Sequence, residues 1–543
     1  MKPLKQQTAG GGSTSWIALF AVVLIWLVVA LSWDIRRPWI EGVDYNGAVW
    51  SQAAHNILRA GLTETWGASS GFYFGPLPIP AWGYYLHHPP LLHLTITGLF
   101  AILGEQEWVA RLVPVGCSLA SALFLWLLVR SCAGTRTATL SLAAFACFPM
   151  QLRYGAMVNF EPCVLMLLLG ALLCLRWHHL SGERKWKYGA LGLIIVGLWV
   201  DWAMYLFVIA LCACWLWSSK GGDRRFAGII FLSTLVSGAL YLLRIQLLRP
   251  DAWQSLSDAF MVRLGTGKGG HFTEAQWLTR MGETLLGHFL PVGLVLGAIG
   301  AVILWRTRSH DEGFQWLGRA CLTVFVMDLL FVGLFQNVSY IHPYSAFYLT
   351  VPLAIGAGVA LDRLIIALQQ AGRPRLFRGV AALSAILILV GLGASGWHRT
   401  RVLAGQFRIL DYHVDEPRSL IPELGEAIRA NFSADTSILC NFLPDYGPHL
   451  AYYAKRDILN NLSEYRFWDP YINDRARRVG GVVWVSSNPA SQNILAQLPT
   501  SGTKRFLTVG AHTFCIWTPG EPGQTPAANA GGSSLPVASA PSP

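Results

Sequence analysis

Long apolar stretches recur along most of the chain, and short polar connections separate them. A helix needs roughly 20 mainly apolar residues to cross a bilayer. Six stretches approach or reach that length, at residues 16–33, 226–243, 289–305, 321–335, 347–361 and 380–393. The pattern predicts a polytopic α-helical membrane unit over residues 16–395, which follows a flexible cytoplasmic N-terminus at residues 1–15.

The charges in the connections predict which side of the membrane each one faces. Lys and Arg favour the cytoplasmic side, and they are concentrated in four connections, at residues 176–187, 218–225, 306–313 and 362–378. The alternate connections should then face outside, namely those near Glu161, near Asp201, at residues 250–287 and at residues 336–345. Lys2 and Lys5 place the N-terminus in the cytoplasm, so the long loop at residues 34–86 is also expected outside. Within that loop, an amphipathic pattern near residues 46–58 predicts a helix on the membrane surface.

Three apolar segments lie between Asp44 and Glu161, at residues 91–103, 109–128 and 138–148. Both acids face outside only if an even number of crossings separates them. The first and third segments are short for a crossing, so one of the segments is expected to be re-entrant or incomplete. This gives about eleven full crossings in a bundle of about 11–13 helices.

The chain changes character after about residue 397. Short β-type runs at residues 437–442 and 482–485, a strand or hairpin pattern at 506–517, and helical periods at 420–430 and 493–498 predict a small α/β domain over residues 397–519. The charge alternation places it outside the membrane, as a periplasmic or extracellular domain, where Cys440 and Cys515 are candidates for a disulfide. The tail at residues 520–543 is rich in Pro, Ala, Gly and Ser and is predicted to be disordered.

Composition agrees with a membrane protein. Hydrophobic residues make up 53% of the chain and charged residues 13%, whereas a soluble domain carries about 25% charged residues. The net charge of +11 comes largely from the short basic connections, so it indicates orientation and contact with membrane lipid, and no nucleic-acid partner is expected. We expect a multi-pass protein of the plasma (inner) membrane.

Several polar residues fall on the predicted outer face. Taken singly, each has an ordinary explanation, such as a helix cap, a helix start before proline or a packed histidine. Their shared side of the membrane favours a site, because ionisable groups at membrane depth are costly. The residues are Asp44, His87, His88, Glu161, Asp201, His342 and Tyr344.

These residue types suit the transfer of a group from a phosphate. Asp44 is a candidate general base for an acceptor, and an anionic leaving group needs positive charge from Arg, Lys or a metal ion. Arg263 and Lys268, in the outer loop at residues 250–287, offer such charge. Glu161 with His87 has the oxygen and nitrogen ligands that suit a divalent metal ion. No organic cofactor is expected.

Four motifs carry a resemblance to a known family. They are Asp44 in the first outer loop, His88-Pro-Pro-Leu-Leu92, Gly104-Glu-Gln-Glu-Trp-Val-Ala-Arg111-Leu, and the run from Arg153 to Glu161-Pro162. In this order they resemble the GT-C glycosyltransferases, specifically the bacterial relatives of protein O-mannosyltransferases and of the lipid A aminoarabinose transferase. The resemblance implies Asp44 as the catalytic acid of the first loop and inversion at the sugar. Two positions depart from the family, because Tyr45 stands where Glu is common and His87-His88 where an acid and Lys are common.

The leading hypothesis is therefore a glycosyltransferase that moves a hexosyl or pentosyl group from a polyprenyl-phosphate donor to a glycolipid, polysaccharide or protein. In it, Glu161 with His87 or His88 organises the donor phosphate or a metal, and Arg263 and Lys268 neutralise the phosphate. Asp201, His342 and Tyr344 have no assigned role. A transporter or lipid flippase is the alternative, and it would place polar groups near the membrane midplane in two matching halves. A scaffold or receptor would leave the membrane acids without a purpose.

Overall fold

The chain divides into two compact units, Met1–His413 and Val414–Pro543. The computed structural model describes residues 13–71, 73–216, 222–265, 272–307, 311–370, 386, 388–398, 418–434, 436–440, 447–459, 479–485, 503–509 and 512–518. The segments predicted to be flexible or disordered, 1–15 and 520–543, lie largely or wholly outside these residues, as does the predicted helix at 493–498. The domain boundary expected near residue 397 falls before the division between the units.

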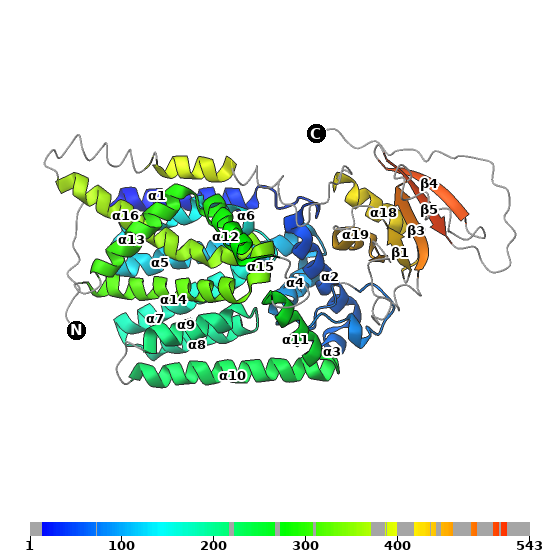
Figure 1. The fold of residues 1–543 in the computed structure, drawn as a ribbon, viewed down its shortest axis with the longest axis horizontal. Helices are drawn as coiled ribbons and strands as arrows, with labels where there is room; N and C mark the ends of the chain where they lie inside the picture. Colours follow the sequence, from blue (N-terminus) through cyan, green and yellow to red (C-terminus); the bar gives the residue numbers. More distant parts are fainter. Residues whose placement is uncertain are drawn as a thin grey trace. The chain divides into compact units, whose positions relative to one another are not determined.

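Helices build the first unit. Figure 1 shows long helices running side by side, with α2, α3, α4, α11 and α15 gathered at one end of the bundle. The helices and 3-10 turns are α1 (Ser13–Ser32), η1 (Gly42–Asp44), α2 (Tyr45–Ala60), α3 (Leu62–Thr65), η2 (Ala81–Gly83), α4 (Leu91–Leu103), α5 (Glu107–Cys147), α6 (Pro149–Tyr154), α7 (Phe160–Ser181), α8 (Arg184–Leu198), α9 (Ala203–Leu216), α10 (Gly222–Leu248), α11 (Ala252–Arg263), α12 (Glu274–Phe289), α13 (Pro291–Thr307), α14 (Glu312–Leu334), α15 (Gln336–Ile341), η3 (Pro343–Leu349) and α16 (Thr350–Gln370).

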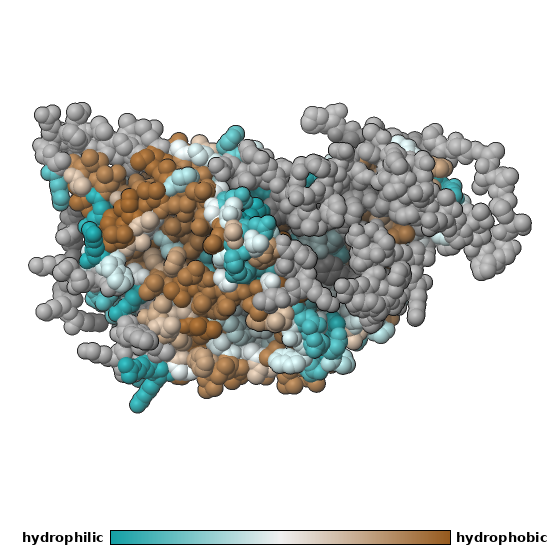
Figure 2. Space-filling model, in the orientation of Figure 1, coloured by the Kyte–Doolittle hydropathy of each residue, from teal (hydrophilic) through white to brown (hydrophobic). Residues whose placement is uncertain are grey.

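Six helices of the described residues are long and apolar enough to cross a membrane, or seven if α12 and α13, bent by 93°, form one span. Apolar side chains cover much of the bundle's visible face, and polar patches lie toward its ends (Figure 2). Leu232 and Leu243 on α10 are 61% and 57% exposed, as expected for side chains that face lipid. The predicted total of 11–13 helices also counted shorter apolar helices, such as Leu91–Leu103.

Helix α5 is two antiparallel segments. Its 41 residues break at Gly134, whose φ of 87° is readily adopted only by glycine. The Trp126 indole donates a hydrogen bond of 3.2 Å to the Thr139 hydroxyl. In a straight helix these residues would be about 20 Å apart, so the chain reverses at Gly134. Residues 109–128 and 138–148, predicted as separate segments, therefore become the two arms of a helical hairpin.

Contacts between the connections agree with the predicted sidedness. Residues of two basic connections meet each other, because His179 contacts Glu312. Residues predicted to be outside also meet each other, because His88 contacts Asp201. Which group of connections faces the cytoplasm stays a prediction.

Helices α13 and α16 pack through glycines that face each other. A Cβ added to Gly300 would lie 1.8 Å from the Gly356 carbonyl oxygen, and small residues allow helices in membranes to approach this closely. Gly300→Ala should therefore force the two helices apart and lower the free energy of unfolding by about 1–3 kcal/mol. The thermal midpoint of the detergent-purified protein measures the loss. Gly318→Ala on α14 is the matched control, because nothing lies within 4 Å of its added Cβ; an equal loss there would contradict the packing argument.

The second unit is a small α/β domain, as predicted. Its five-stranded sheet has the order β2-β1-β3-β5-β4, with parallel pairs β1–β2 and β1–β3 and antiparallel pairs β3–β5 and β4–β5. Cys440 on β1 and Cys515 on β5 are both in the reduced form. Strand β3 lies between their strands, so the disulfide considered for them does not form. The elements are η4 (Arg418–Leu420), α18 (Ile421–Asn431), β1 (Ser437–Cys440), α19 (Gly447–Ala454), β2 (Asp457–Leu459), β3 (Val479–Val485), β4 (Thr503–Val509) and β5 (His512–Thr518).

Candidate active site

Asp44 lies where the first outer loop turns into α2. It ends the 3-10 turn η1, and its side chain is buried. Backbone N–H groups of Ile40 and Glu41 donate to its Oδ2 at 3.3 and 3.1 Å. The Arg37 Nη2 donates to both carboxylate oxygens at 3.2 and 3.3 Å, and the Arg111 Nη2 donates to Oδ1 at 3.0 Å. The loop thus wraps around the carboxylate.

Arg111 fixes this arrangement from the side of the bundle. It projects from α5, is 5% exposed, and stacks on the Trp39 ring at 3.9 Å. Its Nη1 donates to the backbone oxygens of Ile35, at 3.0 Å, and Arg37. One guanidinium therefore binds the carboxylate, an aromatic face and two carbonyls. We call Asp44, Arg37, Arg111 and Trp39 the Asp44 cluster.

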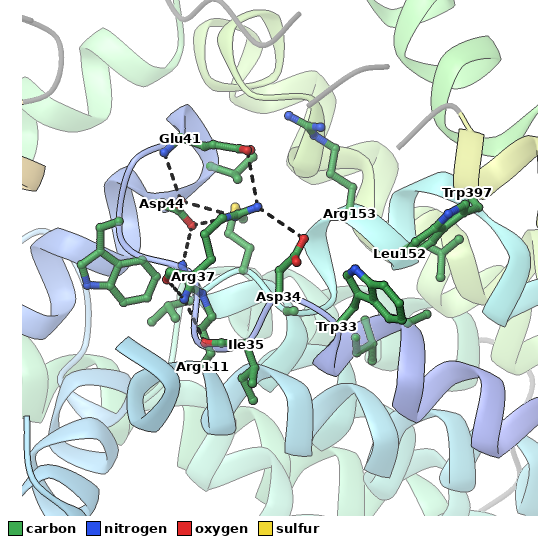
Figure 3. Close-up of a pocket in the computed structure, with 17 residues that line it drawn as sticks. Trp33, Asp34, Ile35, Arg37, Glu41, Asp44, Arg111, Leu152, Arg153 and Trp397 are labelled. Atoms are coloured by element: carbon green, nitrogen blue, oxygen red, sulfur yellow. Dashed lines mark hydrogen bonds and ion pairs between the residues drawn. The ribbon is translucent and has the colours of Figure 1, made fainter. Parts of the chain in front are cut away.

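A cavity of about 320 Å³ opens at the Asp44 cluster (Figure 3). The end of α1 supplies apolar lining that includes Trp33, and the region after α6 and Trp397 complete the wall. Trp33 is 63% exposed and meets Trp397 edge to face at 6.3 Å. The cavity thus has a charged wall around Asp44 and an aromatic wall beside a helix whose surface is largely exposed.

A second group of polar residues lies at the start of α4, and we call it the histidine cluster: Tyr85, His87, His88, Asp201 and Arg263. The Nδ1 of His88 lies 2.9 Å from Asp201 Oδ1; since a carboxylate only accepts, Nδ1 carries the hydrogen. Arg263 donates to the Tyr85 hydroxyl at 3.1 Å. His87 Nε2 lies 3.1 Å from the Ser255 hydroxyl on α11. Segments from three parts of the sequence, at residues 85–88, at Asp201 and in α11, therefore converge here.

Glu161 lies in the first turn of α7, next to Phe160, whose ring stacks on His88 at 4.6 Å. Its side chain is buried and interacts electrostatically with Asp201. The Oε2 atom has no hydrogen-bond partner among the described residues. A buried carboxylate oxygen is costly without a partner, so this atom is available to a ligand or water.

Helix α2 begins at the Asp44 cluster and contacts aromatic groups near Glu161. The Asn46 amide donates to the Tyr344 hydroxyl at 3.4 Å, and Tyr344 stacks on His342 at 4.9 Å and meets Tyr154 edge to face. Asn46 is two residues after Asp44. Asp44 at the N-cap of α2 and Asn46 in its first turn therefore connect the Asp44 cluster to these aromatic groups.

Burial keeps the outer histidines neutral. It lowers the pKa of His87 to about 3, with help from the positive charge of Arg263, and it lowers the pKa of His342 to about 4. Burial also lowers the pKa of His88, although Asp201 opposes the shift. Neutral imidazoles donate or accept hydrogen bonds but carry no charge, so Arg263 supplies the positive charge of the histidine cluster near neutral pH.

The lowered pKa values predict a loss of stability in acid. A histidine whose pKa is about 3 in the folded protein and 6.5 in the unfolded chain binds protons preferentially when unfolded. Stability should be complete above pH 6.5 and fall below it, by up to about 1.4 kcal/mol per pH unit for each such histidine. Thermal midpoints between pH 7.5 and 5 measure this, and His87→Gln should reduce the slope. An unchanged slope in His87→Gln would contradict the neutral state inferred for this ring.

The structure brings most of the predicted residues to one end of the bundle. His88 contacts Asp201, and His87, His88 and Arg263 each contact Tyr85. Asp44 forms its own cluster, and Lys268 lies outside the described residues. None of the described contacts joins His87 to Glu161, and the described residues contain no group of three or more His, Cys, Asp or Glu that could hold a metal ion. The metal pair of Glu161 with His87 therefore stays a prediction.

Arg37, Arg111 and Tyr85 were not predicted as site residues. Arg111 begins an apolar stretch of the sequence, where a charged residue indicates a buried partner. The motif Gly104–Leu112 therefore already contained a signal for this residue. Arg37 is an ordinary loop arginine in the sequence, and Tyr85 one of many aromatic residues, so neither carries a comparable signal.

The fold places the chain in a class. A helical membrane unit followed by a small α/β domain matches the fold of solved GT-C glycosyltransferases over most of this chain. The chain has the GT-C fold, and the resemblance found in the sequence is confirmed. Residues 87–245 match the family model of dolichyl-phosphate-mannose-protein mannosyltransferases. No curated protein matches the sequence.

Particular structures that resemble this chain come from bacteria and archaea. ArnT from Cupriavidus metallidurans in the apo state is 15% identical with a TM-score of 0.61, and the match covers 93% of this chain and 98% of ArnT. ArnT from the same organism bound to undecaprenyl phosphate is 14% identical with a TM-score of 0.62, and the match covers 93% of this chain and 98% of ArnT. AglB from Archaeoglobus fulgidus, in complex with an inhibitory peptide and a dolichol-phosphate, is 13% identical with a TM-score of 0.55. The match covers 87% of this chain and 69% of AglB. The arabinofuranosyltransferase AftD from Mycobacteria is 15% identical with a TM-score of 0.50, and the match covers 94% of this chain and 40% of AftD.

Proposed function

We propose that the protein transfers a hexosyl or pentosyl group from a polyprenyl-phosphate donor to an acceptor at the outer face of the plasma (inner) membrane, with inversion at the sugar. The observation that carries the proposal is the pairing of the clusters at one end of the bundle. One holds a buried carboxylate beside a cavity, and the other holds a cation among neutral hydrogen-bonding groups. A base and a cation for a leaving phosphate are what this transfer requires.

The histidine cluster is the proposed donor site. Arg263 would neutralise the phosphate, and Tyr85 and His87 would hydrogen-bond its oxygens, while Lys268 of the same outer loop would add charge. Glu161 lies next to this cluster with one carboxylate oxygen unpaired among the described residues, which suits a hydroxyl of the sugar. The undecaprenyl phosphate bound to ArnT and the dolichol-phosphate bound to AglB support a lipid-phosphate donor by analogy of fold.

Asp44 is the proposed general base. In the reaction, the acceptor oxygen forms a bond to the anomeric carbon while the bond from that carbon to the phosphate oxygen breaks. The acceptor proton moves to the Asp44 carboxylate, and polyprenyl phosphate leaves with its charge held by Arg263. Since the described residues do not form a metal-binding group, no step is assigned to a metal ion.

The acceptor is a glycolipid, polysaccharide or protein, and the cavity beside Asp44 is its proposed place. The α/β domain is proposed to lie on the periplasmic or extracellular side and to shape the acceptor side of the reaction.

A turnover assay tests the proposal. The purified full-length protein is supplied with undecaprenyl-phosphate hexoses and pentoses and a membrane lipid extract, and mass spectrometry follows undecaprenyl phosphate and glycosylated products. We expect release of undecaprenyl phosphate for at least one donor. Movement of an intact lipid across proteoliposomes without such release would instead favour the transporter or flippase alternative.

A further inference from the structure

The Asp44 carboxylate has no free acceptor position in this structure. An ionised carboxylate offers about four lone-pair positions. Four donor groups occupy them: the backbone N–H groups of Ile40 and Glu41, and the guanidinium groups of Arg37 and Arg111. An acceptor hydroxyl can donate its proton to Asp44 only after one of these donors has left.

Three of the four donors are held in place. The two N–H groups belong to the loop backbone that turns into η1. Arg111 is 5% exposed, stacks on Trp39, and also binds two backbone oxygens of the same loop. Removing Arg111 from Asp44 would therefore break several other contacts together.

Arg37 is held less firmly, and it has other places to go. Its side chain is 27% exposed, and its Nη2 is shared between the two Asp44 oxygens at 3.2 and 3.3 Å. Its Nη1 already lies 3.4 Å from Glu41 Oε1 and 4.0 Å from Asp34 Oδ2. Its Nε has no partner among the described residues. Figure 3 shows Arg37 between the three carboxylates, all of which line the cavity.

We infer that Arg37 is a positioning residue that occupies the place of the acceptor hydroxyl on Asp44, and that it moves to Glu41 and Asp34 when the acceptor enters the cavity. The inference rests on the proposed function of Asp44. In the new position the guanidinium keeps two carboxylate partners, so the exchange leaves no buried charge without a counterion. The acceptor O–H then donates to the vacated position on Asp44.

This arrangement also protects the donor from water. With Arg37 on Asp44, a water molecule in the cavity finds no open carboxylate position and is not activated for attack on the sugar. Arg37→Met should open that position permanently. Hydrolysis of the donor should then increase even when no acceptor is added.

Donor hydrolysis tests the inference without knowledge of the acceptor. The probe is the undecaprenyl-phosphate sugar that supports turnover, and the measurement is undecaprenyl phosphate released per enzyme in the absence of acceptor. Arg37→Met should raise this rate about tenfold or more relative to wild type, and the rise should vanish in the double variant with Asp44→Asn. Arg111→Met should lower the rate, because it displaces the carboxylate.

Arg37→Lys provides a second measurement if Arg37→Met does not fold. A lysine keeps the charge near the three acids but has a single nitrogen, so it cannot contact Asp44 and Glu41 from separate nitrogens as Arg37 does, and a smaller rise is expected. If the wild-type enzyme turns over normally and a folded Arg37→Met or Arg37→Lys protein shows unchanged or reduced hydrolysis, the inference about Arg37 is overturned, while the proposed sugar transfer stands. A wild type that releases no undecaprenyl phosphate from any donor would contradict the proposed sugar transfer itself.

Discussion

Asp44→Asn should lower kcat by about 10²–10⁴-fold, the range that a positioned general base contributes. The amide keeps the size of the side chain but cannot accept a proton from the acceptor, and it places an NH₂ group where two guanidinium groups now donate. Donor binding should change little, because the histidine cluster is separate from Asp44. Initial rates of undecaprenyl phosphate release with saturating donor and a membrane lipid extract as acceptor measure the effect.

Glu64→Gln is the matched control for Asp44→Asn. Glu64 is an exposed acid of the same outer loop, in α3, and its replacement should leave kcat unchanged. Both variants must elute and melt as folded protein, since Asp44 also organises its loop. Wild-type turnover in a folded Asp44→Asn protein would remove this carboxylate from the chemistry.

Arg263→Gln should raise the KM for the lipid-phosphate donor by about 10–100-fold. A hydrogen bond to a charged group contributes about 1.5–3 kcal/mol, and 1.4 kcal/mol corresponds to a factor of ten. Arg263 is the guanidinium that meets Tyr85 within the histidine cluster, and the neighbouring imidazoles are neutral. Initial rates across a series of donor concentrations give the KM.

Arg249→Gln separates a specific contact from a general loss of positive charge. Arg249 lies on the same outer side, at the end of α10, but it is already paired with Asp251 at 2.6 and 2.7 Å. Its replacement should shift the donor KM by less than about threefold, because its charge is already paired with Asp251. Equal effects of the two variants would indicate that overall charge, and not a phosphate site at Arg263, sets donor affinity.

The features of the fold that could be predicted from the sequence are those that repeat locally. Apolar runs of membrane length, the amphipathic pattern that becomes α2, and the short β-type runs that become β1 and β3 all follow from periodicity. Even so, α2 lies mostly buried against the protein instead of on the membrane surface. Its buried polar residues, Gln52 and Asn56, pair with the protein interior, and amphipathic periodicity alone does not distinguish protein from membrane as the partner.

The partners of each candidate residue could not be predicted in the same way. The sequence placed Asp44, Glu161 and the histidines on one side, but the contact of His88 with Asp201 joins residues 113 positions apart. The enclosure of Asp44 by Arg37 and Arg111 depends on how a long loop folds against α5. The reversal at Gly134 lies between two apolar segments that were predicted separately, but the glycine that allows it has no distinct signature in the sequence until its φ is known.

Asp44 is the N-cap of α2 and Asn46 lies in its first turn, so the separation between the base and the aromatic groups around Tyr344 is set largely by helical backbone geometry. A helix is stiff compared with a loop, and two residues within one turn cannot drift apart by side-chain motion alone. Changes in the length of the preceding loop would alter how substrates reach the carboxylate but not this spacing. The start of α2 thus fixes the distance between the base and these aromatic groups. Substitutions that break the first turn of α2 would change which substrate dimensions the site can accommodate.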